Sequence, residues 1–413
     1  MRRYTEVVKM SIRVAILIAF FSSVWGVSRK PSIFHENREF PVMDVPELVR
    51  YWGYEIETHY VTTDDGYILG MHRIPHGKNR NGTTRNKPIF MTHCLVCNSA
   101  IWLFGPPEKS LGYLLADQGY DVWFGNTRGN TYSRNHLTLT PSNNDFWDFG
   151  FDDSGVFDYK AEIDYILEMT GEDQVHFIGH SMGTTQFIVF ASELAEYNDK
   201  IAGAYLMGPA VTMTNANNPI FIISELAGSV EFLFHIFGQY EFLPHYDIIS
   251  WLAHTFCDVT GNAVLGELCE NIVFLVTGIN EAQLNMTMMP IYLDNLPAGS
   301  STRPFVHYAQ LHLLENEFRK FDFGKKENMA RYGTEVPPSY DLSKVTAPVA
   351  LFVGDKDDLA CPADNEFLVT QLPHVIHHEV VDFHGWTHLD FSIGIDADKL
   401  IYQTIMDMIS SFD

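Results

Sequence analysis

At 413 residues, the chain is long for one simple domain and short for three, which predicts two domains or one large domain with an insertion. Hydrophobic residues make up 46% of the chain and charged residues only 19%, so a disordered chain is excluded and a large core is expected. With 27 Lys and Arg against 52 Asp and Glu, the net charge is −25, which disfavours binding to nucleic acid. The 18 His would gain charge in acid and offset much of this, which suits an acidic compartment.

Residues 1–28 have the pattern of a secretory signal peptide. Basic residues precede the apolar run Val14–Phe21, which is too short to span a bilayer comfortably, and we expect cleavage near 26–28. No later stretch reaches 18 uncharged apolar residues, so the mature chain is expected to have no stable transmembrane anchor and to enter the secretory pathway. Glycosylation sequons at Asn81 and Asn285 agree with this route.

Strands alternate with helices in the first half of the mature chain. Residues 61–69 predict a hairpin around an Asp-Gly turn. Residues 145–153, which are acidic and aromatic, are expected to form a solvated turn and a helix cap. The other patterns predict strands over 88–93, 120–125, 175–179 and 202–207 and helices over 111–119, 158–169 and 182–194. Such alternation indicates βαβ units and a parallel sheet.

The alternation stops near Val211, and strands resume at 349–354 and 378–382 before a closing helix over 397–410. The intervening chain is helical and aromatic. Its apolar run at 220–237 is either a lid helix that faces lipid or an ordinary buried helix. We therefore predict a mostly parallel α/β core in two parts, 29–211 and 336–413, with a helical insertion over 212–335.

A G-x-S-x-G pentapeptide lies between the predicted strand at 175–179 and the helix that follows. In that setting the chain turns so sharply that side chains at Gly179 and Gly183 would clash. The turn would expose Ser181 as a nucleophile at a helix N-terminus, where backbone N–H groups can hold an anion. The alternative is a glycine-rich turn whose serine has no chemical role.

A serine nucleophile needs a His base and an orienting acid. In the α/β-hydrolase fold, where G-x-S-x-G forms this turn, the chain order is Ser, acid, His. His388, in a loop before the last helix, is the predicted base, and His384 is its competitor. The acid is expected after the strand at 349–353, where three aspartates lie: Asp355, Asp357 and Asp358. The N–H groups of Leu95, after an early strand, and of Met182 are the expected oxyanion donors.

This chemistry needs neither a cofactor nor a metal ion. The C-x-x-C spacing of Cys94 and Cys97 has no thioredoxin-like context and no second pair, so redox or zinc functions are disfavoured. Three histidines near the C-terminus have no acidic partners at ligand spacing, which disfavours metal binding there: His374, His377 and His378.

Several motifs together resemble the acid lipase family of α/β-hydrolases, which comprises gastric and lysosomal acid lipases, from about Val45 to the C-terminus. The motifs are Tyr51-Trp-Gly-Tyr, Thr63-Asp-Asp-Gly-Tyr-Ile-Leu, His72-Arg-Ile-Pro-His-Gly-Lys, Gly119-Tyr-Asp-Val-Trp-Phe-Gly-Asn-Thr-Arg-Gly-Asn, Gly179-His-Ser-Met-Gly-Thr-Thr, Asn295-Leu-Pro-Ala-Gly-Ser-Ser and His388-Leu-Asp-Phe. The resemblance implies a triad of Ser181, Asp357 and His388, with Asp357 chosen because it precedes Leu-Ala-x-Pro. It also implies a cap with a movable lid and a cap disulfide between Cys257 and Cys269, and Cys361 is expected to be free.

The chain departs from the family at three positions near the expected site. Cys94 stands where the family usually has Gly, and since Gly allows backbone angles that Cys tolerates poorly, the oxyanion loop is the main departure. Met182 replaces a Gln whose side chain is not needed for the oxyanion, and Cys361 replaces an Asp.

The sequence therefore predicts an acid lipase that hydrolyses carboxylic esters of neutral lipids at a lipid–water interface. Triacylglycerols, cholesteryl esters or both are the expected substrates, and Ser181 would carry the acyl group. The alternatives are an esterase or phospholipase that acts on other esters, and a non-catalytic lipid carrier on a lipase scaffold. The intact Ser, Asp and His disfavour the carrier.

Overall fold

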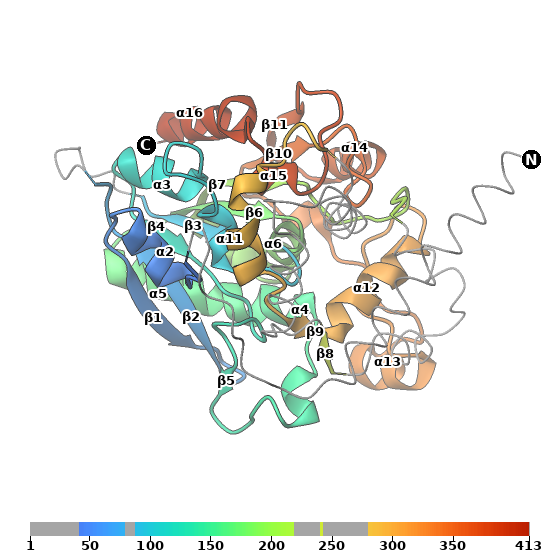
Figure 1. The fold of residues 1–413 in the computed structure, drawn as a ribbon. Coiled ribbons are helices and arrows are strands. Elements are labelled where there is room, and N and C mark those ends of the chain that lie inside the picture. The colour runs from blue at the N-terminus through green and yellow to red at the C-terminus, as the bar shows by residue number, and fades with distance from the viewer. Residues whose placement is uncertain (1–40, 79–86, 219–239, 243–279, 413) are drawn as a thin grey trace, which may run out of the picture.

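The computed structural model describes residues 41–78, 87–218, 240–242 and 280–412 (Figure 1). The predicted signal peptide, the apolar run at 220–237, Asn81 and the Cys257–Cys269 pair lie outside these ranges. Those expectations, the glycosylation of the half-buried Asn285 and the domain boundaries therefore stay predictions. Within the described ranges, no helix is both long and apolar enough to cross a bilayer.

A mixed, mostly parallel sheet forms the centre of the protein. Its strands lie in the spatial order β1 (Glu57–Thr62), β2 (Tyr67–Ile74), β4 (Val122–Phe124), β3 (Ile89–Thr92), β6 (Val175–His180), β7 (Ile201–Met207), β10 (Val349–Val353) and β11 (Val375–Val380). The predicted hairpin is confirmed as the antiparallel β1–β2 pair, and β2 also pairs antiparallel with β4 and with β5 (Asn135–His136). From β4 to β11 every pairing is parallel, as the βαβ pattern predicts.

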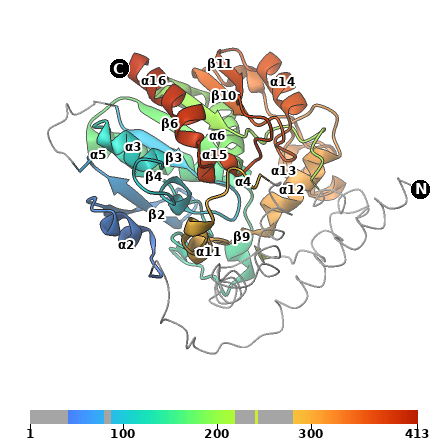
Figure 2. The same cartoon turned by 45° about the horizontal axis from the view of Figure 1, so that its top comes forward.

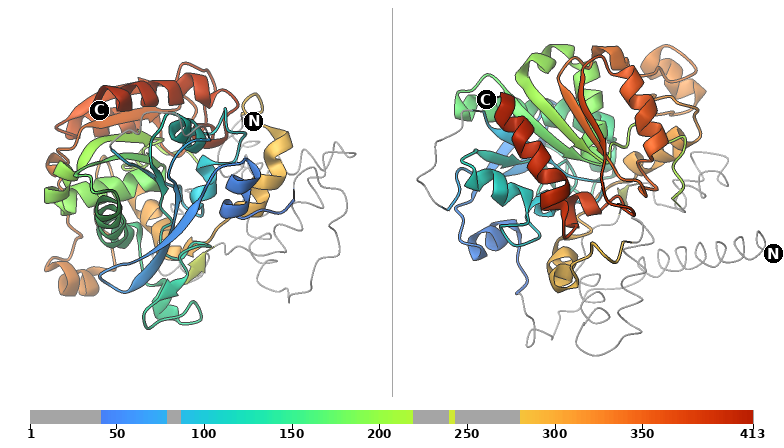
Figure 3. Two further views of the ribbon diagram at one scale, coloured as in Figure 1. Left: turned by 90° about the vertical axis from the view of Figure 1, so that its left-hand side faces the viewer. Right: turned by 90° about the horizontal axis from the view of Figure 1, so that it is seen from above.

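Helices cover both faces of this sheet (Figure 3). One face packs against α2 (Val45–Tyr51), α3 (Leu111–Asp117), α15 (Asp390–Ile393) and α16 (Gln403–Phe412), and the other against α5 (Tyr159–Thr170), α6 (Met182–Glu193) and α14 (Pro362–Gln371). Side chains alternate between the two faces along each strand. In β7, Tyr205 thus belongs to the first cluster and Leu206 to the second. Near-continuous apolar strands are expected where both faces are covered.

The described part of the predicted insertion is mainly helical. It contains α11 (Met289–Asn295), α12 (Thr302–His312) and α13 (Lys325–Tyr332), with a short antiparallel pair of β8 (Glu241–Phe242) and β9 (Ser300–Ser301) (Figure 2). On α12, His307 stacks against the ring of Phe151 at a centroid distance of 4.2 Å. On α11, Tyr292 contacts Phe104 of the core. Aromatic contacts thus join this part of the chain to the core at two places.

The expectation of a solvated turn over 145–153 is wrong for its aromatic residues. Phe146, Phe149 and Phe151 are buried, and the first two pack around Tyr67 of β2. The acidic side chains of Asp145 and Asp148 remain exposed. Charged and aromatic residues therefore divide between solvent and core within one short segment, and the composition of the segment did not reveal this.

Arg128, in the loop after β4, is a buried cation between two carboxylates. Its guanidinium donates to Asp158 at 2.8 Å and to Asp65 at 2.5 Å, and it lies 4.1 Å from the ring centroid of Tyr67. Asp158 precedes α5 and is fully buried, whereas Asp65 lies in the hairpin turn. The ion pairs therefore join the hairpin, the sheet and α5.

Replacement of Arg128 by methionine should destabilise the fold strongly, because it leaves the buried Asp158 carboxyl without a counter-charge. We expect the free energy of unfolding to fall by about 3–5 kcal/mol in equilibrium urea denaturation of Arg128→Met. Lys160→Met is the matched control, since Lys160 pairs with the exposed Asp64, and it should change stability by at most about 1 kcal/mol. Equal stabilities for the two variants would contradict this role of Arg128.

Candidate active site

Ser181 occupies a sharp turn between β6 and α6. Its backbone φ is 55° and its ψ is −117°, a region that non-glycine residues rarely adopt. A Cβ atom at Gly179 would lie 3.1 Å from the carbonyl carbon of Gly183, and one at Gly183 would lie 2.6 Å from Thr92 Oγ1. These contacts agree with the expectation that only glycine fits at both positions.

Three strand ends bring Ser181, Asp357 and His388 together, since these residues follow β6, β10 and β11. His388 Nε2 lies 2.7 Å from Ser181 Oγ, and His388 Nδ1 lies 2.7 Å from Asp357 Oδ2. The other carboxylate oxygen accepts the N–H groups of Leu359 and Ala360 at 2.9 and 2.7 Å. Burial favours the neutral form of Asp357, but the facing His388 and these N–H groups hold its pKa below the ordinary value.

The competing acid and base form a separate pair at the surface. His384 Nδ1 lies 2.9 Å from Asp355 Oδ2, and the His384 side chain is 87% exposed. Asp355 also accepts the N–H groups of Gly385 and Trp386 at 2.8 Å. The two candidates that the sequence left open thus bind each other, and neither contacts Ser181 among the described residues.

Neither expected oxyanion donor is hydrogen-bonded to any of the described residues. Met182 is the first residue of α6, so its N–H has no acceptor within the helix. In the described part of the chain, neither this N–H nor that of Leu95 has a hydrogen-bond partner. The site therefore combines a hydrogen-bonded Ser–His–Asp chain with two unpaired N–H donors.

Comparison with known proteins identifies the family. A family model for the alpha/beta hydrolase fold matches residues 87–393, and one for a partial alpha/beta-hydrolase lipase region matches residues 45–105. The chain is 36% identical to lysosomal acid lipase/cholesteryl ester hydrolase of Homo sapiens over 372 residues. This alignment covers 90% of the chain and 91% of that protein. The chain belongs to the acid lipase family of α/β-hydrolases.

Two further comparisons extend this result. The chain is also 36% identical to gastric triacylglycerol lipase of Rattus norvegicus over 371 residues. This alignment covers 89% of the chain and 92% of that protein. A solved structure of a soluble variant of monoglyceride lipase from Saccharomyces cerevisiae has a TM-score of 0.51 at 16% identity and covers 92% of this chain and 98% of that one. The structural likeness concerns the fold alone. Together with the family match, these relatives make the chain a lipase, a carboxylic ester hydrolase.

A disulfide between Cys94 and Cys97 closes the loop that holds Leu95, the expected oxyanion donor. The C-x-x-C spacing, which suggests only redox or zinc chemistry, did not predict this bond, although the predicted secretory route favours disulfides. The expectation that Cys94 must adopt glycine-like backbone angles is also wrong. The residue with a positive φ in this loop is Val96, at 54°. The free thiol expected at Cys361 is confirmed, and it is buried.

Two buried histidines that the sequence analysis did not single out hold the loops of the site. His93 Nδ1 donates to Cys94 O at 2.8 Å, and its Nε2 accepts from Thr127 N and Asn130 Nδ2. His180 Nε2 donates to the carbonyl oxygen of His388 at 2.8 Å. Burial lowers the pKa of His93 to about 4, and burial with the neighbouring His388 lowers that of His180 to about 3. Both therefore keep these hydrogen bonds at mildly acidic pH.

Asp390 joins the loop of His388 to the predicted insertion, at Asn280. Its Oδ2 accepts the N–H of Thr387 at 2.7 Å and the side-chain amide of Asn280 at 2.6 Å. Burial raises its pKa from the ordinary 3.8 to about 6, although these hydrogen bonds oppose the shift. The carboxyl beside the site therefore changes charge in mildly acidic solution.

This raised pKa makes the stability of the lipase depend on pH through Asp390. Between about pH 4 and 6 the folded state holds a proton that the unfolded chain has lost, so stability falls as the pH rises through about 6. Relative to Asp390→Asn, which has no titrating group there, the lipase should lose up to about 3 kcal/mol of unfolding free energy from pH 4 to pH 7. Urea denaturation of both proteins at several pH values measures this. A difference that does not change with pH would refute it.

Proposed function

We propose that the lipase hydrolyses carboxylic esters of neutral lipids, triacylglycerols or cholesteryl esters, with Ser181, His388 and Asp357 as its catalytic residues. The supporting observation is the pair of 2.7 Å hydrogen bonds that links Ser181 through His388 to the buried Asp357. The substrate class is supported by relatives named lysosomal acid lipase/cholesteryl ester hydrolase and gastric triacylglycerol lipase. Those names and the signal-like segment also support a lysosomal or extracellular enzyme that acts at a lipid–water interface.

In acylation, Ser181 Oγ attacks the ester carbonyl carbon while His388 Nε2 accepts the hydroxyl proton. Asp357 accepts the hydrogen bond from His388 Nδ1, which fixes the tautomer and stabilises the imidazolium. The N–H groups of Leu95 and Met182 hold the negative oxygen of the tetrahedral intermediate. The imidazolium then protonates the leaving alcohol, and the acyl group remains on Ser181.

In deacylation, water takes the place of the alcohol. His388 accepts a proton from the water as it attacks the acyl ester, and a second tetrahedral intermediate binds the same two N–H groups. His388 returns the proton to Ser181 Oγ, and the fatty acid leaves. Every proton transfer thus involves one imidazole nitrogen, His388 Nε2.

The surroundings of these residues support work in acid. The lowered pKa of Asp357 keeps this carboxyl ionised in mild acid. The low pKa values of His93 and His180, about 4 and 3, keep both side chains neutral, so the loops that carry the oxyanion donor and His388 retain their supports. Asp357, His93 and His180 thus hold the same charge at about pH 5 as at neutral pH, whereas Asp390, whose pKa is about 6, gains a proton.

The decisive experiment measures fatty-acid release by the mature lipase and by Ser181→Ala. Emulsified triolein, emulsified cholesteryl oleate and a short soluble ester would be tested from acid to mildly alkaline pH. We expect hydrolysis of at least one emulsion, fastest in acid, and a fall of about 10⁴-fold or more in Ser181→Ala. Activity confined to the short ester near neutral pH would indicate an esterase, and no activity from the folded protein would indicate a lipid carrier.

The two histidine–aspartate pairs offer a matched test of the catalytic assignment. His388→Ala and Asp357→Asn should each lower kcat by about 10⁴-fold, because the first removes the base and the second removes the acceptor that fixes its tautomer. His384→Ala removes an exposed imidazole that does not contact Ser181 and should leave kcat within about threefold. A loss of activity in His384→Ala as large as that in His388→Ala would contradict the assignment.

A further inference from the structure

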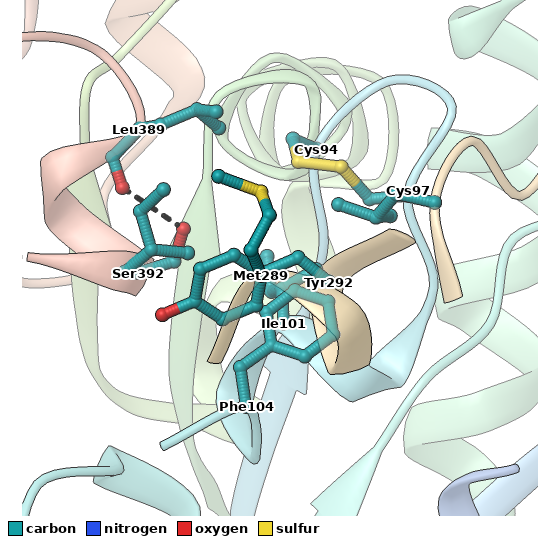
Figure 4. A pocket seen from close by; sticks show the side chains of 10 residues that line it. Cys94, Cys97, Ile101, Phe104, Met289, Tyr292, Leu389 and Ser392 are labelled. Atoms are coloured by element: carbon teal, nitrogen blue, oxygen red, sulfur yellow. Dashed lines mark hydrogen bonds between the residues drawn. A yellow bond between two sulfur atoms is a disulfide. The ribbon is translucent and has the colours of Figure 1, made fainter. Parts of the chain in front are cut away.

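The Cys94–Cys97 disulfide encloses the residue that would supply one oxyanion donor. The two half-cystines are three positions apart, and between them lie only Leu95 and Val96. Both half-cystines are buried at 5% exposure. Figure 4 shows the bond in the wall of an apolar cavity of about 70 Å³, with Met289 and Leu389 among its other lining residues. Leu389 follows His388 directly, so the disulfide lies beside the candidate active site.

Three carbonyl groups of the loop accept hydrogen bonds from other parts of the backbone and from side chains. Cys94 O accepts from His93 Nδ1 at 2.8 Å and from Cys97 N at 3.2 Å. Val96 O accepts from Ala298 N at 2.6 Å, and Cys97 O accepts from Asn130 Nδ2 at 3.4 Å. Among the described residues the N–H of Leu95 has no partner, in a loop whose carbonyl groups at 94, 96 and 97 are all bound. Such a loop holds a donor in place for a ligand.

The turn needs such restraint because Val96 has a φ of 54°. A β-branched residue is strained in this region and keeps the conformation only when its surroundings impose it. A disulfide that closes so short a segment does little for global stability, since the entropic gain grows with the length of the closed loop. Its effect is therefore concentrated on the conformation of the segment itself.

We propose that the Cys94–Cys97 disulfide is a positioning element that holds the Leu95 N–H in the oxyanion hole. The inference rests on the proposed function, because it requires Leu95 to bind the tetrahedral intermediate. The disulfide acts through Leu95 and not on the reacting atoms. Since the donor is used in the transition state, loss of the bond should lower kcat and leave KM almost unchanged.

The first test is the full-length double variant Cys94→Ser/Cys97→Ser, with Cys361→Ser as the control for loss of a buried thiol. On a short soluble ester, the double variant should lose about 10- to 100-fold in kcat, while its KM should stay within about threefold. This loss of kcat is at most similar to that caused by removal of a whole oxyanion donor. Its melting temperature and circular dichroism should stay close to those of Cys361→Ser. A double variant with the kcat of the unmodified lipase would overturn the proposal.

The second test is independent of how well the double variant folds. A water-soluble trialkylphosphine reduces the bond: one phosphine and one water give two thiols and the phosphine oxide, and mass mapping of alkylated peptides verifies the thiols at 94 and 97. Reduction of the folded lipase should lower kcat by a similar factor, and reoxidation with oxidised glutathione should restore it. Where the double variant folds, the phosphine should not change its activity. No loss on verified reduction, or an equal loss in the double variant, would overturn the proposal.

These results are separable from the proposed function. If the untreated lipase hydrolyses no ester, the proposed function itself fails. If the untreated lipase is active and loss of the disulfide leaves kcat unchanged, only the role of the disulfide fails.

Discussion

The backbone turn at Ser181 is the constraint on which the arrangement of the site depends. A Cβ atom at Gly183 would lie 3.1 Å from Thr92 O and 3.2 Å from His93 O, so the start of α6 packs backbone to backbone against the end of β3. This close approach brings the loop of Leu95 to the helix that begins with Met182. Two N–H donors can then converge on one oxygen beside Ser181, the proposed nucleophile. The positive φ of Ser181 is tolerated because the sheet and the helix fix both ends of the turn.

The histidines of the site show how burial divides one residue type between two roles. His93 and His180 are buried against backbone acceptors, and burial keeps them neutral as structural donors. His388 faces the carboxylate of Asp357 and the hydroxyl of Ser181, which is the arrangement of a base. Two carboxyls differ in the same way: N–H groups and an imidazole lower the pKa of Asp357, whereas burial raises that of Asp390.

The oxyanion loop reaches this arrangement by means that the family resemblance did not imply. Cys94 occupies the position where the family usually has glycine, and its backbone does not adopt a positive φ. The left-handed residue is Val96, inside the ring that the disulfide closes. His93 and Asn130, which are uncharged donors, hold the carbonyl groups of Cys94 and Cys97. A covalent bond and a neutral hydrogen-bond network therefore act on the same short segment.

The sequence by itself determined the parallel sheet, the strand–turn–helix around Ser181 and the order of nucleophile, acid and base, because these follow from local periodicity and from a motif whose glycines have a steric cause. Residue patterns alone left three aspartates as candidates for the acid and His384 as a competitor of His388, the predicted base, and only the family resemblance selected Asp357. Side chains of neighbouring residues differ in direction, and only the packing of β10 beside β11 directs Asp357 to His388 and Asp355 to His384. The burial of the rings at 146–151 and the lowered pKa values of His93 and His180 likewise arise from tertiary contacts. Burial and partner choice depend on residues distant in the sequence, and only the folded chain brings these together.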